Sequence, residues 1–299
     1  MNITISGASG LIGRRLLKLL AKDGHSLTAL SRHGGTNLPP GVRLSIWDAT
    51  KGEPPADALR DADAVIHLAG VPVAQRWDAQ VKQEIRDSRV VGTRNLVQAL
   101  AKLPRKPQVL ISSSATGYYG SRGDEVLSES STPGSDFLAQ VCVDWEKEAQ
   151  AAEQFGVRVV RIRTGIVLDA RGGALQRMLP PFKMGAGGKL GSGRHWMSWI
   201  HLDDLASLFQ FALVNSVSGV FNGTAPNPVT NADFTKALAS ALHRPAMFPV
   251  PGLALKLLFG EMGEILLASQ RVTPKATQSA GFQFRFPEIA PALADVLKG

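Results

Sequence analysis

The chain lacks several features that define major protein classes. Its 299 residues contain a single cysteine, Cys142, which excludes an intramolecular disulfide framework and favours a reducing compartment. No uninterrupted apolar run reaches the length that spans a bilayer, and no basic segment followed by an apolar stretch opens the chain. The sequence therefore predicts a cytoplasmic protein with no membrane association.

Three common kinds of functional site are also missing from the sequence. No group of His, Cys, Asp and Glu has the spacing of a metal site, so no bound metal is expected. No G-x-S-x-G elbow of a serine hydrolase occurs. The 33 Lys and Arg residues outnumber the 25 Asp and Glu residues, for a formal net charge of +8, but they form no dense tract. A nucleic-acid partner is therefore not expected, whereas a small, phosphate-rich ligand suits a positive cleft.

The first half of the chain alternates strand-like and helix-like segments, a pattern typical of a doubly wound parallel sheet. The expected strands cover residues 3–6, 25–30, 42–46, 64–70, 109–112 and 157–163, and the clearest helices cover 16–22 and 79–103. We therefore predict an α/β fold with a Rossmann-type sheet.

The pattern changes after about residue 169. Residues 171–193 are crowded with glycine and proline, and strict alternation stops there. A further helix is expected at 203–212. We expect a dinucleotide-binding domain of residues 1–170, with 202–220 packing back on it. Residues 171–201 and 221–299 would then form a smaller C-terminal α/β lobe.

The most informative motif is GASGLIG at residues 7–13, which lies between a β-branched strand and an amphipathic helix. The unpaired N–H groups at a helix start bind a pyrophosphate well. Glycines permit the tight turn, the close approach of the phosphate, and close packing of helix on strand. The predicted cofactor contacts are Gly7, Ser9, Gly10, Leu11, Ile12 and Gly13, together with Leu68, Ala69 and Gly70 at the end of the fourth strand.

The end of the second strand indicates which dinucleotide is bound. An acidic residue there usually holds the adenosine ribose of NAD, but this strand ends in Ser31 and Arg32. Arg32 can hold a 2′-phosphate with charge-assisted hydrogen bonds, and Ser31 can add a donor. We therefore favour NADP(H) over NAD(H); the alternative is an ordinary surface arginine and NAD. Asp48, after the third strand, could contact the adenine amino group or cap a turn.

Several motifs together resemble the extended short-chain dehydrogenase/reductases, which include sugar-nucleotide epimerases and dehydratases. They are GASGLIG, the strand end His67–Gly70, the serine segment Ser112–Thr116 and the segment Trp196–Asp204. Residues 172–175, 178–183, 268–272 and 281–287 are similar to the YfcH-like "epimerase family" branch. The resemblance spans nearly the whole chain and implies a nicotinamide cofactor.

The resemblance also implies a catalytic tyrosine followed four residues later by a lysine, and this chain lacks that pair. Its two tyrosines, Tyr118 and Tyr119, directly follow the serine segment. With Glu146 as the anchor, the tyrosine position holds Leu138 and the lysine position holds Cys142. Cys142 could be a reactive thiol, but its apolar helix favours a buried structural role.

Other residues remain as catalytic candidates. Ser114 matches the family's catalytic hydroxyl, and Tyr118 or Tyr119 could donate a proton. His201 could act on the substrate or simply bond a neighbouring aspartate. The sequence thus predicts an NADP(H)-binding oxidoreductase or epimerase that acts on a carbonyl or hydroxyl carbon of a small molecule. The alternative is a non-catalytic NADPH-binding regulator or sensor. A homodimer is possible in either case, and Lys189 could hold an anionic substrate or be a solvated loop charge.

Overall fold

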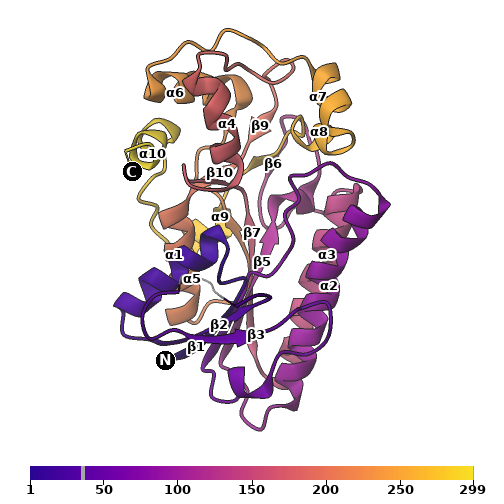
Figure 1. The fold of residues 1–299 in the computed structure, drawn as a ribbon, viewed down its shortest axis with the longest axis vertical. Helices are drawn as coiled ribbons and strands as arrows, with labels where there is room; N and C mark the ends of the chain where they lie inside the picture. Colours follow the sequence, from indigo (N-terminus) through magenta and orange to yellow (C-terminus); the bar gives the residue numbers. More distant parts are fainter. Residues whose placement is uncertain (35–37, 299) are drawn as a thin grey trace.

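A seven-stranded parallel sheet forms the centre of the molecule in the computed structural model, which describes residues 1–34 and 38–298 (Figure 1). Its spatial order is β11-β7-β5-β4-β1-β2-β3. The strands are β1 (Asn2–Ser6), β2 (Ser26–Ser31), β3 (Arg43–Ile46), β4 (Ala64–His67), β5 (Val109–Ala115), β7 (Arg158–Thr164) and β11 (Gly219–Gly223). Every neighbouring pair is parallel. The predicted Rossmann-type fold is confirmed.

Helices cover both faces of this sheet, which explains why its strands are rich in apolar residues (Figure 1). The helices are α1 (Leu11–Lys22) and α5 (Leu202–Val214) on one face, and α2 (Ala79–Lys102) and α3 (Phe137–Gln150) on the other. Successive strand residues point to opposite faces: Leu110 packs in the core under α2 and α3, and Ile111 packs in the core under α1 and α5.

The order of the strands determines where a ligand can bind. The chain starts at β1 in the middle of the sheet, adds β2 and β3 on one side, and then returns to add β4 and β5 on the other. In such sheets the ligand crevice lies outside the carboxyl ends of the strands, where the order reverses. That point is between β1 and β4 and places residues 7–13 beside residues 68–70.

A smaller group of elements lies above the sheet in Figure 1 and has its own apolar core. Its helices are α4 (Gly173–Lys183), α6 (Asn231–Leu242), α7 (Gly252–Phe259), α8 (Met262–Ile265) and α10 (Ile289–Val296), with α9 (Lys275–Ser279) near the sheet. Its short strand pairs are β8 (Ile166–Leu168) with β10 (Trp199–His201), β9 (Trp196–Met197) with β12 (Val229–Thr230), and β6 (Val126–Leu127) with β13 (Arg271–Val272). Leu175, Phe182 and Phe234 are buried together in this core.

Helix α4 is the main difference from the sequence-based expectation, because it forms within the glycine- and proline-rich segment 171–193, where no helix is predicted. Pro180 and Pro181 lie inside this helix. The apolar side chains of Leu175, Leu179 and Phe182 share one face and are buried. Burial of that face offsets the hydrogen bond that a proline removes from a helix.

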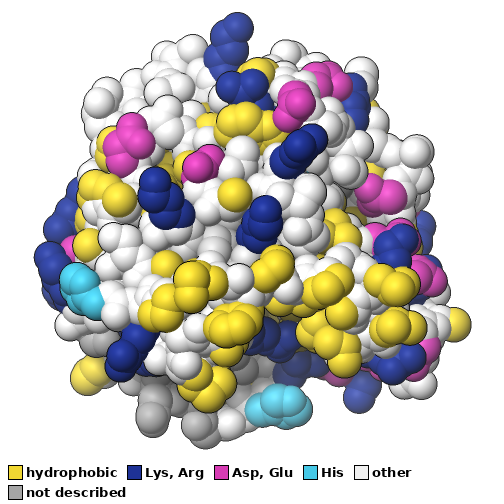
Figure 2. Space-filling model, turned by 90° about the horizontal axis from the view of Figure 1, so that it is seen from above, with side chains coloured by type: hydrophobic (Ala, Val, Ile, Leu, Met, Phe, Trp, Pro, Cys, Tyr) yellow, Lys and Arg dark blue, Asp and Glu magenta, His cyan; other side chains and the backbone are white. Residues whose placement is uncertain are grey.

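The upper face carries several exposed apolar side chains. They belong to α7 and the loop before it: Met247, Phe248, Leu253, Leu257 and Leu258. Seen from above, the basic side chains are dispersed over this face rather than collected in one tract (Figure 2). Among the described residues, no helix combines the length and hydropathy needed to cross a membrane.

Candidate functional site

The glycine turn after β1 brings three backbone segments into close contact. Gly7 has φ 66°, and a Cβ built there would lie 2.7 Å from the carbonyl carbon of Leu68. A Cβ at Gly13 would lie 2.5 Å from the carbonyl oxygen of Gly7. Neither position accommodates a side chain, so the glycines join the turn, the start of α1 and the end of β4.

The N-terminus of α1 faces this turn with its backbone donors free of local caps. The N-cap residue is Gly10, which has no side chain to accept a hydrogen bond, and the first turn contains no acidic residue. Ser9 and Gly10 are exposed. A pyrophosphate therefore fits this helix start, where N–H groups and partial positive charge converge. Leu11 also contacts the start of α4, because a Cβ at Gly172 would lie 3.0 Å from its Cδ1.

The predicted adenosine end lies at the carboxyl ends of β2 and β3. Ser31 is buried as the last residue of β2, and Arg32 beyond it is exposed. Asp48 accepts hydrogen bonds from the backbone N–H and the hydroxyl of Thr50, at 3.1 and 2.9 Å, and so caps a turn. Burial raises the pKa of Asp48, but those bonds and the charges of Lys51 and Arg32 hold it below its usual value. Arg32 thus lies within electrostatic range of Asp48 at this edge.

Ser114 lies near the end of β5, but its hydroxyl is engaged by a buried ion pair. Its Oγ donates to Glu146 Oε1 at 2.6 Å. The same carboxylate accepts Arg163 Nε at 2.7 Å and Nη2 at 2.9 Å. All three residues are at most 5% exposed. Burial alone would lower the pKa of Arg163, but the hydrogen bonds and charge of Glu146 raise it above its ordinary value.

The two tyrosines that follow β5 occupy different environments. The hydroxyl of Tyr119 donates to Asn222 Oδ1 at 2.7 Å and accepts from Arg163 Nη1 at 3.0 Å. Tyr119 is fully buried, and burial raises its pKa to about 12. Tyr118 is half-buried, with Arg163 Cζ 3.3 Å from its ring centroid. No hydrogen bond joins the Tyr118 hydroxyl to any residue that the structure describes.

The residues at the family's tyrosine and lysine positions face the short 3-10 helix that follows β5, Thr116–Tyr119. A Cβ built on Gly117 would lie 3.5 Å from Leu138 Cβ and 3.9 Å from Cys142 Sγ. Leu138 has no proton to exchange. Cys142 is buried, and burial raises the pKa of its thiol to about 12, so no thiolate forms near neutral pH.

His201 holds a structural position at the start of α5. Its Nδ1 accepts the backbone N–H of Asp203 at 3.0 Å, which caps the helix, and its Nε2 lies 3.3 Å from Asp295. The ring stacks on Phe286 at 4.0 Å between centroids. Burial lowers the pKa of His201, although the nearby aspartates oppose this shift. The local bond to an aspartate segment, which the sequence left as one alternative, is present.

Sequence reasoning missed the buried charges around this edge. Glu146 served only as an alignment anchor, and Arg163 only as a member of a strand. A signal did exist, because an arginine in a buried parallel strand and a glutamate on the apolar side of a helix each require a partner.

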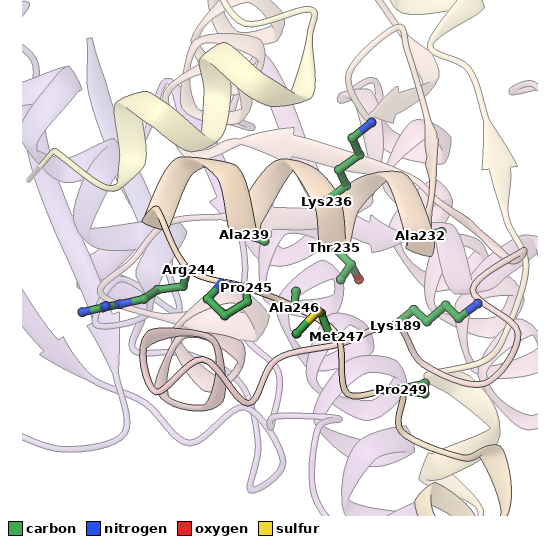
Figure 3. A pocket seen from close by; sticks show the side chains of 10 residues that line it. All are labelled: Lys189, Ala232, Thr235, Lys236, Ala239, Arg244, Pro245, Ala246, Met247 and Pro249. Atoms are coloured by element: carbon green, nitrogen blue, oxygen red, sulfur yellow. The ribbon is translucent and has the colours of Figure 1, made fainter.

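A cavity of about 380 Å³ lies away from this edge, between α6 and residues 244–249. Its lining residues are Lys189, Ala232, Thr235, Lys236, Ala239, Arg244, Pro245, Ala246, Met247 and Pro249. Figure 3 shows the charged ends of Lys189, Lys236 and Arg244 directed away from one another. Because the charges do not converge, the cavity does not form an anion site.

Comparisons with known proteins agree with this geometry. The model of the NAD dependent epimerase/dehydratase family matches residues 3–223, and that of a domain of unknown function, DUF1731, matches residues 250–296. The chain is similar to the chloroplastic homolog of epimerase family protein SDR39U1 from Arabidopsis thaliana, with 41% identity over 100% of this chain and 87% of the relative. It is also similar to epimerase family protein MT2273 from Mycobacterium tuberculosis, with 44% identity over 97% of this chain and 96% of the relative.

Solved structures give the same result. The structure of human epimerase family protein SDR39U1 with NADPH has a TM-score of 0.88 and 35% identity, covering 100% of this chain and 99% of that one. UDP-glucuronic acid 4-epimerase from Bacillus cereus, at 18% identity and a TM-score of 0.80, shares the fold over 100% of this chain and 99% of its own. The resemblance drawn from the motifs is confirmed: the chain belongs to the NAD dependent epimerase/dehydratase family, among the epimerase family proteins related to SDR39U1.

Proposed function

We propose that the protein binds NADP(H) and acts on a carbonyl or hydroxyl carbon of a small molecule. The observation that carries the cofactor proposal is the exposed Arg32 directly after β2, beside a glycine turn without room for side chains. A guanidinium there matches a 2′-phosphate, which an acidic residue would repel. The human relative crystallised with NADPH supports the same choice.

The residues of the glycine turn and of the strand ends hold the cofactor in this proposal. The backbone N–H groups of residues 11–13 bind the pyrophosphate, Arg32 and Ser31 bind the 2′-phosphate, and Asp48 together with residues 68–70 flanks the adenosine. When bound, NADP(H) supplies or accepts a hydride.

The proton for this reaction requires a hydroxyl that protein groups do not already occupy. Tyr119 and Ser114 are engaged in the buried network, and His201 caps α5. Tyr118 is half-buried and lies against the arginine that holds the network together. We therefore assign proton transfer to Tyr118. Ser114 has a positioning role, because it binds Glu146, which holds the arginine that lies against Tyr118.

A non-catalytic NADPH sensor is the second candidate function. The observation in its favour is the replacement of both members of the usual acid–base pair by Leu138 and Cys142, two side chains that transfer no proton here. Positioned proton transfer contributes about 10²–10⁴-fold to a rate, so its loss reduces turnover strongly without affecting cofactor binding.

The cofactor assignment is tested by comparing NADPH and NADH affinities in an arginine variant. Arg32→Asp should weaken NADPH binding by about 10- to 100-fold, the value of one or two charge-assisted hydrogen bonds, and leave NADH nearly unchanged. Arg60→Asp is the control, because Arg60 is an exposed arginine at the other end of the strands. Equal weakening of both cofactors by Arg32→Asp would refute the 2′-phosphate assignment.

The two candidate functions are separated by a turnover assay. The protein and NADPH are mixed with a panel of carbonyl compounds and nucleotide sugars, and both absorbance loss and substrate isomerisation are followed. Turnover that Tyr118→Phe abolishes, with NADPH affinity retained, supports the enzyme. Tight NADPH binding without reaction across the panel supports the sensor.

A further inference from the structure

A half-buried cation without a carboxylate partner lies beside the end of β4. Arg89 on α2 donates from Nη2 to the carbonyl of Val71 at 3.2 Å and from Nη1 to the carbonyl of Ile85 at 3.1 Å. A Cβ built on Gly70 would lie 3.3 Å from Arg89 Cζ. Within residues 1–34 and 38–298, no ion pair includes this guanidinium, whereas neighbouring Arg86 pairs with Asp144 at 2.7 Å.

The guanidinium also lies against α3, the helix that carries the position of the missing lysine. Arg89 Cζ lies 5.3 Å from the ring of Trp145. Burial lowers the pKa of Arg89, and the adjacent Cys142 sulfur opposes that shift, so the two side chains are electrostatic neighbours. An arginine stays protonated even when its pKa is lowered. A permanent positive charge therefore lies against α3, one helical turn from Cys142 at the level of Trp145.

The hydrogen bonds of Arg89 leave part of its guanidinium free. Of its five N–H donors, the carbonyls of Val71 and Ile85 take two, and the hydroxyl of Ser88 lies at the outer limit of hydrogen bonding, 3.5 Å from Nη1. No hydrogen bond engages Nε among the described residues. These donors of the half-buried guanidinium are therefore available to a ligand.

The residues around Arg89 lie at the carboxyl edge of the sheet, where the proposed cofactor binds. Gly70 and Val71 follow β4, at the reversal of strand order where the dinucleotide crevice lies. Cys142 on α3 lies next to Gly117, which belongs to the 3-10 helix that follows β5. Arg89 thus lies between the ends of β4 and β5, beyond the pyrophosphate turn and on the side away from β2 and Arg32.

We propose that Arg89 replaces the missing lysine, and that its guanidinium donates hydrogen bonds to the ribose hydroxyls of the nicotinamide half of NADP(H). This inference rests on the proposed cofactor binding and extends it to a residue on a different helix. The charge that the family's pattern places at position 142 of α3 comes here from α2. Arg89 is a binding residue in this role, and the small thiol of Cys142 leaves room for it.

The test compares two ligands that share the adenosine end. NADPH contains the nicotinamide ribose, and adenosine 2′,5′-bisphosphate keeps the 2′-phosphate but lacks that ribose. Arg89→Met should weaken NADPH binding by about 10- to 100-fold and change adenosine 2′,5′-bisphosphate binding by less than about twofold. Retained binding of the smaller ligand also shows that the variant is folded. Arg86→Met, one helical turn away on α2, is the matched control and should affect neither ligand.

Two further variants test whether Arg89 takes the role of the lysine that the family has at position 142. Arg89→Lys keeps the charge and should retain NADPH affinity to within about fivefold, and adding Cys142→Lys to Arg89→Met should recover most of the lost affinity. Equal affinity changes for the two ligands in Arg89→Met would overturn the proposal. So would a double variant that binds adenosine 2′,5′-bisphosphate normally but NADPH no better than Arg89→Met. A wild-type protein that binds neither ligand refutes the cofactor proposal itself.

Discussion

Replacing Glu146 by glutamine should destabilise the protein far more than replacing Glu148, although the two residues lie two positions apart on α3. Glu146 is 5% exposed and binds both Ser114 and Arg163. Glu148 pairs with Arg94, and the two side chains are 21% and 48% exposed. The two substitutions remove the same charge from the same helix, so the difference between their unfolding free energies measures the effect of burying the ion pair.

The magnitude follows from the neighbours of each carboxylate. Removing one member of a buried ion pair leaves the other charge unpaired and costs about 3–5 kcal/mol. The glutamine oxygen can still accept one hydrogen bond, so Glu146→Gln should cost about 3 kcal/mol. An exposed pair is worth about 0–1 kcal/mol, which sets the expectation for Glu148→Gln.

Denaturant unfolding followed by tryptophan fluorescence measures both costs, and a double-mutant cycle identifies the partner. Arg163→Met alone should also cost about 3 kcal/mol or more, and the double variant should cost at least about 2 kcal/mol less than the sum of the single changes. Free energies for Glu146→Gln and Glu148→Gln that agree within about 1 kcal/mol would refute the reasoning. Additive single changes would show that the two side chains are not coupled.

Three further predictions concern the glycine turn, a buried histidine and the cysteine. Gly13→Ala should abolish measurable NADPH binding because its Cβ would overlap the Gly7 turn. Gly24→Ala lies beyond the far end of α1, where a Cβ meets nothing within 4 Å but the φ of 76° is strained for alanine; it should cost about 1–2 kcal/mol of stability and leave NADPH affinity unchanged in the same titration. Burial lowers the pKa of His67 to about 4, so between pH 6.5 and 4 the unfolded chain binds a proton that the folded protein does not. The free energy of unfolding should therefore fall by about 3 kcal/mol as the pH is lowered across that window. His67→Asn should flatten this dependence of stability on pH, whereas His33→Gln, at an exposed histidine, should not. Cys142 should resist a thiol reagent in the native protein at pH 8 and react fully in denaturant, and rapid native labelling would contradict its burial.

The parts of this fold that the sequence predicts are those governed by local chemistry. Residues 64–67 are apolar enough to form a buried strand, and the glycine at 13 is required by contacts with Gly7 and Ala8 in the same turn. The same local reasoning missed α4, because proline and glycine frequencies concealed the spacing of Leu175, Leu179 and Phe182. There the packing of a distant core decides the structure.

The candidate site depends on contacts that no sequence spacing reveals. The ion pair between Glu146 and Arg163 joins a helix to a strand, and Arg89 on α2 lies 5.3 Å from the ring of Trp145 on α3. Glu146 and Arg163 were visible only as charged residues in apolar segments, and Arg89 only as one charge among several on a polar helix. Such a residue requires a partner, but the identity of the partner follows from the three-dimensional arrangement.

This chain departs from its family by more than the replacements at positions 138 and 142, because the buried network also engages Ser114. The hydroxyl of Ser114 is held by Glu146, which Arg163 holds in turn, so this serine is not free to bond a reacting oxygen. Arg163 also lies across the ring of Tyr118 and thereby fixes the position of that side chain. The charge that would have come from position 142 is supplied, in our proposal, by Arg89. In that proposal the acid–base site is rearranged as a unit, and restoring a tyrosine and a lysine alone would leave Ser114 still bound to Glu146.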